Sequence, residues 1–327
     1  MRKFFKITGY IVGAVVIVAL SALTYFNMTY PRVEKAPDIS IKLTPARVER
    51  GSYLVNSVVG CFDCHSKRDW DKFSGPIKQG TEGMGGEKLD EKGAGVPGTL
   101  YAPNITPAAL GNWTDGQIVR ALTCGVDNKG RALYPIMPYA QMNSMSKEDI
   151  YSIVAYLRTI KPIQNNVPRG SLNFPMNLIV KTMPIYSFDP PPPPDTNNMV
   201  SYGNYLVNAA DCAGCHTPMS NGNYVKGMML AGGVPFQMSG GIARSANITP
   251  DSATGIGKWD VERFVSFFKA FASDSSADIR VSPSDYNTPM PMTSFAGMTD
   301  HDLSAMYDYL RTINPVHNEV VNWTPGK

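Results

Sequence analysis

The sequence contains few of the residue types on which most metal sites and nucleic-acid interfaces depend. Its 327 residues include only four histidines and five cysteines. A structural zinc site takes four Cys or His ligands, so few residues remain for one here. The formal net charge is only +3 at pH 7. A charge this small gives no electrostatic footprint for nucleic acid, and we expect no nucleic-acid partner.

Four of the five cysteines fall in two copies of one short motif, Cys-x-x-Cys-His. This is the attachment signature of a c-type haem, in which both thiols bond to the haem and the histidine becomes an iron ligand. A thioredoxin-like site or a disulfide is the alternative for a Cys-x-x-Cys pair, but neither needs the adjacent histidine. The sequence therefore predicts two covalently attached haem c groups, held by Cys61, Cys64 and His65 and by Cys212, Cys215 and His216.

The N-terminus contains a long apolar run. Residues 7–26 carry no charged side chain and are rich in Val, Ile, Ala and Leu. About 20 such residues span a bilayer as one helix. Because Arg2, Lys3 and Lys6 precede the run, we expect a cytoplasmic N-terminus, an anchor over residues 1–30 in the bacterial inner (cytoplasmic) membrane, and periplasmic haem domains. A cleaved signal peptide is the alternative, and it also places the cysteine pairs outside the cytoplasm.

The two halves of the chain repeat the same elements in the same order. The matched segments are 53–56 with 205–208, 104–107 with 247–250, 137–138 with 290–291, and 156–160 with 309–313. Such a repeat predicts a tandem of two similar domains, each with one haem. The expected division is an anchor at 1–30, a first domain at 45–168, a Pro-rich linker at 169–198 and a second domain at 199–320.

Capping signals and apolar spacing predict helices within each half. Thr44-Pro45, Thr114-x-x-Gln117, Asp260, Ser146-x-x-Asp149 and Thr299-x-x-Asp302 are typical of helix starts. Gly51 and Gly203 lie inside predicted helices, which favours a close approach to another helix. The expected apolar faces are Val261, Phe264, Val265 and Phe268; Ile150, Ile153, Val154 and Leu157; and Leu303, Met306, Tyr307 and Leu310.

A methionine opposite the histidine closes a haem site and raises its potential. The repeat aligns Met137 with Met290, and both lie in Pro-rich loops whose stiff backbone suits an axial ligand. Met292 is the competitor of Met290. The other aligned pair, Met145 and Met298, precedes a helix cap and suits a hydrophobic staple. We therefore predict Met137 and Met290 as the sixth iron ligands.

Other residues have weaker assignments. Asn104, Trp113, Asn247 and Trp259 recur in both halves and either contact the haem edges or serve as core and turn residues. His301 and His317 have no histidine counterpart in the first half, so we expect them at the surface. Cys124 has no cysteine counterpart and is expected to be a small buried residue.

With these motifs in place, the chain resembles the membrane-bound multihaem cytochrome c subunits of bacterial alcohol, aldehyde and gluconate dehydrogenases, over about residues 45–320. The resemblance implies a mainly α fold of two class I cytochrome c domains, His/Met ligation and electron transfer. Those subunits usually carry three haem domains, whereas this chain has two motifs, so the resemblance does not ensure a dehydrogenase partner.

The expected function is electron transfer in a respiratory chain, with no catalytic activity of its own. Electrons would enter from a dehydrogenase or quinol-oxidising complex and leave to a terminal oxidase or soluble cytochrome. A di-haem peroxidase is the alternative, and it needs an iron that is open or can open. The Gly-rich segment from Gly80 to Gly98 is either a docking element or a disordered insertion.

Overall fold

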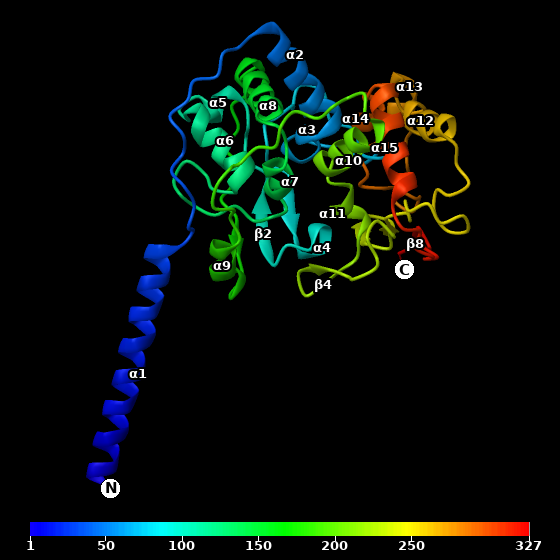
Figure 1. Ribbon diagram of the computed structural model, residues 1–327. Helices are drawn as coiled ribbons and strands as arrows, with labels where there is room; N and C mark the ends of the chain where they lie inside the picture. The colour runs from blue at the N-terminus through cyan, green and yellow to red at the C-terminus, as the bar shows by residue number, and fades with distance from the viewer. Residues whose placement is uncertain (327) are drawn as a thin grey trace.

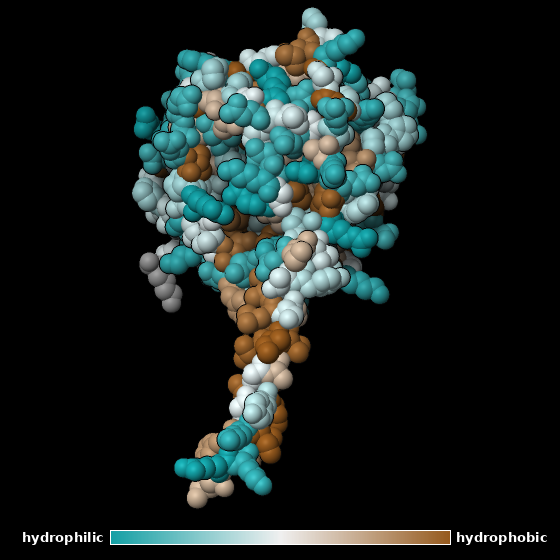
Figure 2. Space-filling view, turned by 90° about the vertical axis from the view of Figure 1, so that its left-hand side faces the viewer, coloured by the Kyte–Doolittle hydropathy of each residue, from teal (hydrophilic) through white to brown (hydrophobic). Residues whose placement is uncertain are grey.

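One long N-terminal helix projects from the folded body of the protein (Figure 1). The computed structural model describes residues 1–326, and 42% of the chain is helical and 9% is strand, in agreement with the predicted mainly α fold. Helix α1 (Arg2–Thr29) buries none of its residues and stands apart from the body (Figure 1). Figure 2 shows apolar residues along most of this helix and a mainly hydrophilic surface on the body. α1 is long and apolar enough to cross a membrane.

The body has two halves with corresponding helices, seen at the left and right of Figure 1. The helical elements from the first half to its connection with the second are α2 (Pro45–Tyr53), the π-helix η1 (Leu54–Val58), α3 (Cys61–His65), α4 (Glu91–Ala94), α5 (Pro107–Leu110), α6 (Asp115–Cys124), α7 (Tyr139–Asn143), α8 (Lys147–Thr159), α9 (Met176–Ile179) and the 3-10 helix η2 (Val180–Thr182). The second half contains α10 (Met199–Ala209), α11 (Cys212–His216), α12 (Val261–Lys269), α13 (Asp274–Ala277), α14 (Met292–Ala296) and α15 (Asp300–Thr312).

The predicted helix starts are confirmed. Thr114 and Gln117 form a reciprocal capping box, because each side chain accepts a hydrogen bond from the other's backbone N–H. Thr44, Asp260, Ser146 and Thr299 each accept a hydrogen bond from a backbone N–H three residues further on. These bonds satisfy N–H groups that a helix cannot pair internally.

Most residues of the predicted apolar faces are buried, Val265 and Tyr307 are half-buried against the core, and one prediction is wrong. All four residues predicted for the face of α8 are buried, as are Leu303, Met306 and Leu310 of α15. On α12, Phe264 and Phe268 enter the core, but Val261 is exposed and its prediction is wrong. Val261 is the first residue after the cap, where the chain has only begun to turn toward the core.

The first and last helices of each half cross at a glycine. α2 packs on α8, and α10 packs on α15. A Cβ atom on Gly51 would overlap the carbonyl oxygen of Ser152, and one on Gly203 would overlap that of Ala305. The predicted close approach is confirmed, because only glycine lets these backbones touch.

Three small antiparallel sheets were not predicted. Their orders are β1 (Lys88–Asp90), β2 (Gly98–Tyr101) and β3 (Ser171–Leu172); β4 (Met219–Ser220) and β5 (Asn223–Tyr224); and β6 (Pro235–Met238), β7 (Gly241–Arg244) and β8 (Trp323–Pro325). The Gly-rich segment 80–98 is not a disordered insertion, since it forms β1 and α4, leads into β2, and places α4 against β6 of the second half.

The segment predicted as a linker, 169–198, begins on the first half. β3 pairs with β2, and α9 and η2 follow it. The backbone N–H of Ile185 donates to Cys124, and the side chain of Asn143 donates to the carbonyl of Ser187. The extended proline run comes only after this packed portion.

The halves meet through an exchange of matching tyrosine–aspartate bonds. The Tyr53 hydroxyl donates to Asp302 (2.7 Å), and the Tyr205 hydroxyl donates to Asp149 (2.6 Å). Each hydroxyl also accepts the backbone N–H of the cap residue before that aspartate's helix, Thr299 or Ser146. Burial and then the neighbouring carboxylate raise the pKa of both phenols, so both remain protonated donors.

Candidate haem-binding sites

Each Cys-x-x-Cys-His motif forms a single helical turn that ends at its histidine. Both histidines are buried, at 7% exposure, and both are fixed through Nδ1. Nδ1 of His65 bonds to the carbonyl of Pro103 (2.8 Å), and Nδ1 of His216 bonds to that of Ala246 (2.7 Å). A carbonyl accepts only from a protonated nitrogen, so Nε2 is left without a proton and free to bind a metal. Burial lowers the pKa of each histidine, which keeps the imidazole neutral as ligation requires.

The Asn-Ile-Thr-Pro loops supply those carbonyl groups. Asn104, directly after Pro103, accepts bonds from the N–H and hydroxyl of Thr106 and donates to the carbonyl of Ile163 (2.7 Å). Asn247 makes the matching bonds to Thr249 and Val316, and it also donates to Thr254. These amides are therefore used to fix the loop that orients the histidine, which is the turn role. Their contact with a haem edge stays a prediction.

A second support of each histidine was missed from the sequence. The carbonyl of His65 accepts the N–H of Gly85 (2.8 Å), and that of His216 accepts the N–H of Gly232 (2.7 Å). Just after each histidine, the hydroxyl of Ser66 or Thr217 accepts a backbone N–H from the same returning loop. The Gly-Gly pairs 85–86 and 232–233 were the available signal, but the unequal loop lengths concealed their correspondence.

The donor set fits covalently attached haem c. All five cysteines are free thiols, and the four motif cysteines are half-buried or exposed, whereas Cys124 is buried as predicted. Each pair lies three residues apart on one helical turn and therefore on one face. Within residues 1–326, no group of three or more His, Cys, Asp or Glu side chains is arranged as an alternative metal site.

The methionine loops have the same backbone geometry in both halves. The N–H of Tyr139 donates to the carbonyl of Met137 (2.7 Å), and the N–H of Met292 donates to that of Met290 (2.9 Å). Met292 thus corresponds to Tyr139, and both are buried at 3% exposure at the start of a helix. This correspondence supports Met290 over Met292 as the counterpart of Met137.

The remaining predicted residues take different places. Trp113 and Trp259 are half-buried against the core, and Arg263 lies over the Trp259 ring. Met145 and Met298 are fully buried beneath the caps, as a staple requires. The side chains of His301 and His317 are 52% and 65% exposed, which confirms their surface placement.

A carboxylate lies in or next to each motif, and each is bonded across the interface between the halves. Asp63 is buried within the first motif, and Asp211 is half-buried directly before the second. Asp63 accepts from the hydroxyl of Ser294 (3.0 Å), and Asp211 accepts from the side chain of Gln141 (2.8 Å). Ser294 and Gln141 each stand four residues after the predicted methionine ligand of the other half. Both motif helices therefore border the interface.

Replacing Asp211 with Asn is expected to stabilise the protein at alkaline but not at acid pH. Burial raises the pKa of Asp211 from 3.8 to about 6. The folded state therefore favours the protonated carboxyl, and this contribution to stability is full below pH 3.8 and is lost as the pH rises through about 6. Asn stays neutral and still accepts the N–H of Gly214. Chemical denaturation should give Asp211→Asn a free energy of unfolding on the order of 2 kcal/mol above wild type at pH 8.

The two proteins should differ little near pH 4, where wild-type Asp211 is itself protonated in the folded state. An Asn variant that is less stable than wild type at pH 8 would contradict the prediction.

Comparison with known proteins finds a cytochrome c family model and several cytochrome c subunits that this chain resembles. Residues 200–314 match the family model for cytochrome c. The chain is 26% identical over 330 residues to the alcohol dehydrogenase (quinone) cytochrome c subunit of Gluconacetobacter polyoxogenes, covering 94% of this chain and 64% of the relative. It is 29% identical over 288 residues to the fructose dehydrogenase cytochrome subunit of Gluconobacter japonicus, covering 81% of this chain and 52% of the relative.

A third relative is smaller. The diheme cytochrome c-type protein of Cereibacter sphaeroides is 30% identical over 200 residues, covering 58% of this chain and 64% of the relative. The chain thus spans less than two thirds of the length of each of these relatives. None of the three is named as a peroxidase.

Proposed function

We propose that this protein is a di-haem c-type cytochrome. Its chain contains a cytochrome c domain and is homologous to the cytochrome c subunits of alcohol, fructose and gluconate dehydrogenases. It transfers electrons between a membrane or periplasmic donor and a downstream acceptor. The observation that carries the proposal is the structural equivalence of the two motif sites, each with its histidine fixed through Nδ1 and its methionine on a matching loop.

The chain's own residues hold the cofactor and close its site. Haem c, when bound, supplies a one-electron couple at its iron. Cys61 and Cys64 in one half, and Cys212 and Cys215 in the other, provide the covalent attachment. The carbonyl bonds at Nδ1 keep each imidazole in one tautomer and one orientation. Met137 and Met290 would each supply a second protein ligand to one iron and so would exclude small molecules from it.

The arrangement of the halves suits transfer between the two sites. Asp63 and Asp211, one at each motif, are both bonded to the opposite half. The two motifs therefore border one interface, and electrons need not cross a mobile linker. The tyrosine–aspartate bonds hold that interface in one geometry.

α1 and the basic residues at its start support the proposed location. This helix anchors the protein in the inner membrane with its N-terminus in the cytoplasm, and the haem domains lie on the periplasmic side. The partners are a dehydrogenase or quinol-oxidising complex as donor and an oxidase or soluble cytochrome as acceptor. The names of the relatives support a dehydrogenase partner.

Replacing Met137 or Met290 with Ala is expected to open one haem each to carbon monoxide. Each substitution removes the side chain that closes an axial position, and the reduced holoprotein should then bind about one equivalent per variant. Met292→Ala is the matched control and should bind none, because Met292 corresponds to the core residue Tyr139.

The resting spectrum separates the proposed function from the peroxidase alternative. A wild-type protein with two six-coordinate, low-spin haems supports the carrier. A persistent five-coordinate, high-spin haem would overturn it in favour of an enzyme with an open site.

A further inference from the structure

A segment of the first half reaches onto the methionine loop of the second half. This segment, residues 68–78, follows the first haem motif directly and is named the arm here. A backbone bridge between Arg68 and Ile77 closes it into a loop, and a second bridge joins Lys72 to Arg280. The N–H of Phe73 donates to the carbonyl of Ile279 (2.7 Å), and the N–H of Val281 donates to that of Asp71 (3.0 Å). The arm therefore pairs with the second half as an added strand would.

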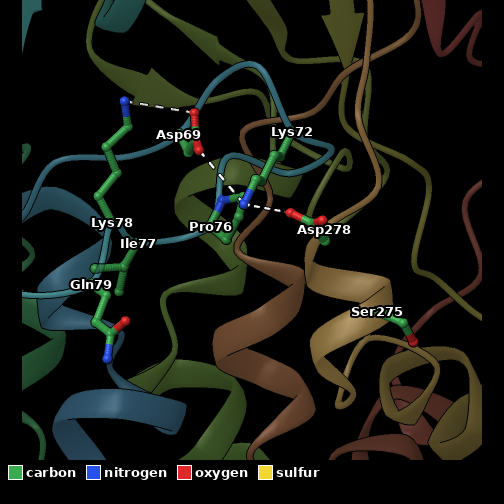
Figure 3. A pocket seen from close by; sticks show the side chains of 8 residues that line it. All are labelled: Asp69, Lys72, Pro76, Ile77, Lys78, Gln79, Ser275 and Asp278. Carbon is green, nitrogen blue, oxygen red and sulfur yellow. Dashed lines mark ion pairs between the residues drawn. The ribbon is translucent and has the colours of Figure 1, made fainter.

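Side chains fix the arm on both sides of this pairing. The ring of Phe73 lies between those of Phe271 and Tyr286, at centroid distances of 5.8 and 5.9 Å. Figure 3 shows Lys72 between Asp69 of the arm and Asp278 of the second half, with the Lys72–Asp278 pair at 2.6 Å. These ion pairs are exposed to solvent and therefore weak, so the aromatic contact and the backbone bonds dominate.

The tip of the arm bonds directly to the backbone at Met290. The hydroxyl of Ser74 donates to the carbonyl of Met290 (2.5 Å) and accepts the N–H of Met292 (3.0 Å). Ser74 is 1% exposed, and its φ is +63°, a left-handed conformation that costs a non-glycine residue free energy. The strained residue is thus one whose hydroxyl bridges the carbonyl of Met290 and the N–H of Met292.

Two further residues extend the contact. Arg68 donates from both terminal nitrogens to the carbonyl of Pro289 (3.2 and 3.3 Å), and its guanidinium lies 4.3 Å from the centre of the Trp70 ring. Asn287 accepts the N–H of Ser74 (2.8 Å) and donates to the carbonyls of Trp70 and Lys72. The backbone before, at and after Met290 is thus held by the first half.

The first half's own methionine loop has no such support. Met137 is held by local bonds, from its N–H to Tyr134 and from the N–H of Tyr139 to its carbonyl. Over residues 1–326, no hydrogen bond joins residues 134–138 to the second half. After the second motif, the chain forms the exposed pair β4–β5 in place of an arm.

We propose that Ser74 and Arg68 are positioning residues for Met290, so that the first half of the chain sets the sixth ligand of the second haem. Outer partners of a metal ligand fix its orientation, and their loss weakens ligation without removing the ligand. The support is one-directional, because the Met137 loop has no equivalent. The second haem is therefore the more firmly closed of the two. This inference rests on the proposed ligand role of Met290.

Ser74→Gly tests the proposal without penalising the fold, since glycine accepts the left-handed backbone that Ser74 adopts. Carbon monoxide should bind the reduced holoprotein variant roughly tenfold faster than wild type, the equivalent of about 1.4 kcal/mol in methionine ligation. The far-red absorption band that a thioether gives a ferric haem should weaken in parallel. Ser74→Ala, which keeps the backbone strain, should behave in the same way.

Double variants assign the effect to one haem. Adding Ser74→Gly to Met290→Ala should change nothing, whereas adding it to Met137→Ala should speed carbon monoxide binding at the second haem. Ser144→Ala is the matched control, because it removes a different hydrogen bond between the halves, the one from Asn208, and should leave both measurements as in wild type.

The outcomes distinguish the positioning role of Ser74 from the ligand role of Met290. If Met290→Ala opens a haem but both Ser74 variants retain the wild-type band and binding rate, the positioning role is overturned and the ligand assignment stands. If Met290→Ala opens no haem, both are overturned.

Discussion

Gly203→Ala is expected to destabilise the second half by about 3 kcal/mol, although alanine is the better helix former. α10 and α15 touch through their backbones at this point, and the new Cβ would overlap the carbonyl oxygen of Ala305. No side chain can move to relieve this, so one helix must shift. Helix propensity returns only about 1 kcal/mol. Because α10 leads directly into Cys212, the shift also disturbs the second haem motif.

Gly51 allows the same experiment in the first half, and Gly93 provides a control. Gly51→Ala should have a comparable effect, since its Cβ would overlap the carbonyl oxygen of Ser152. Gly93, an exposed residue of α4, has room for a methyl group, so Gly93→Ala should be neutral or stabilising by up to about 1 kcal/mol. Chemical denaturation of the holoprotein measures all three. A Gly203→Ala protein that unfolds at the wild-type denaturant concentration would show that the helices are not in backbone contact.

These glycines mark what the sequence alone predicted well. A glycine inside an amphipathic helix, repeated at the same place in both halves, has a local signature and a cost that only packing explains. The helix caps at Thr114, Ser146 and Thr299 are local in the same sense, since each bond spans three residues. The haem motifs are equally local, and the structure adds the carbonyl partners of their histidines.

The contacts between the halves had no such signature. Ser74 and Met290 are 216 residues apart, and no periodicity connects them. The Gly-rich segment lacks an apolar pattern because backbone bonds to Ala102 and to the residues around His65 order it, and backbone bonds leave little trace in the side-chain sequence. The repeat identified Tyr53 with Tyr205 and Asp149 with Asp302 as equivalent positions. It did not show that each tyrosine bonds to the aspartate of the opposite half.

The equivalent aspartates of these bonds, Asp149 and Asp302, have different further partners and are expected to respond differently to substitution. Asp149 accepts two bonds from Arg50 (2.8 and 3.0 Å) besides the hydroxyl of Tyr205. At the position equivalent to Arg50 the second half has Tyr202, so Asp302 accepts from the hydroxyls of Tyr53 and Tyr202, at 2.7 and 3.2 Å. Its other side-chain contact is the exposed imidazole of His301 at 3.3 Å. The Asp149 site contains an arginine cation, whereas no arginine or lysine within residues 1–326 pairs with Asp302.

Asp149→Asn is therefore expected to cost about 3 kcal/mol of unfolding free energy, because it leaves the half-buried Arg50 guanidinium without a counter-charge. Asp302→Asn should cost only about 1 kcal/mol, since the amide oxygen still accepts a hydroxyl and no cation is stranded. Adding Arg50→Met to Asp149→Asn removes the stranded charge and should recover most of the loss. Equal costs for the two single variants in chemical denaturation would show that Arg50 does not depend on Asp149. The predicted order would show that the two halves use the same interface geometry with different electrostatics.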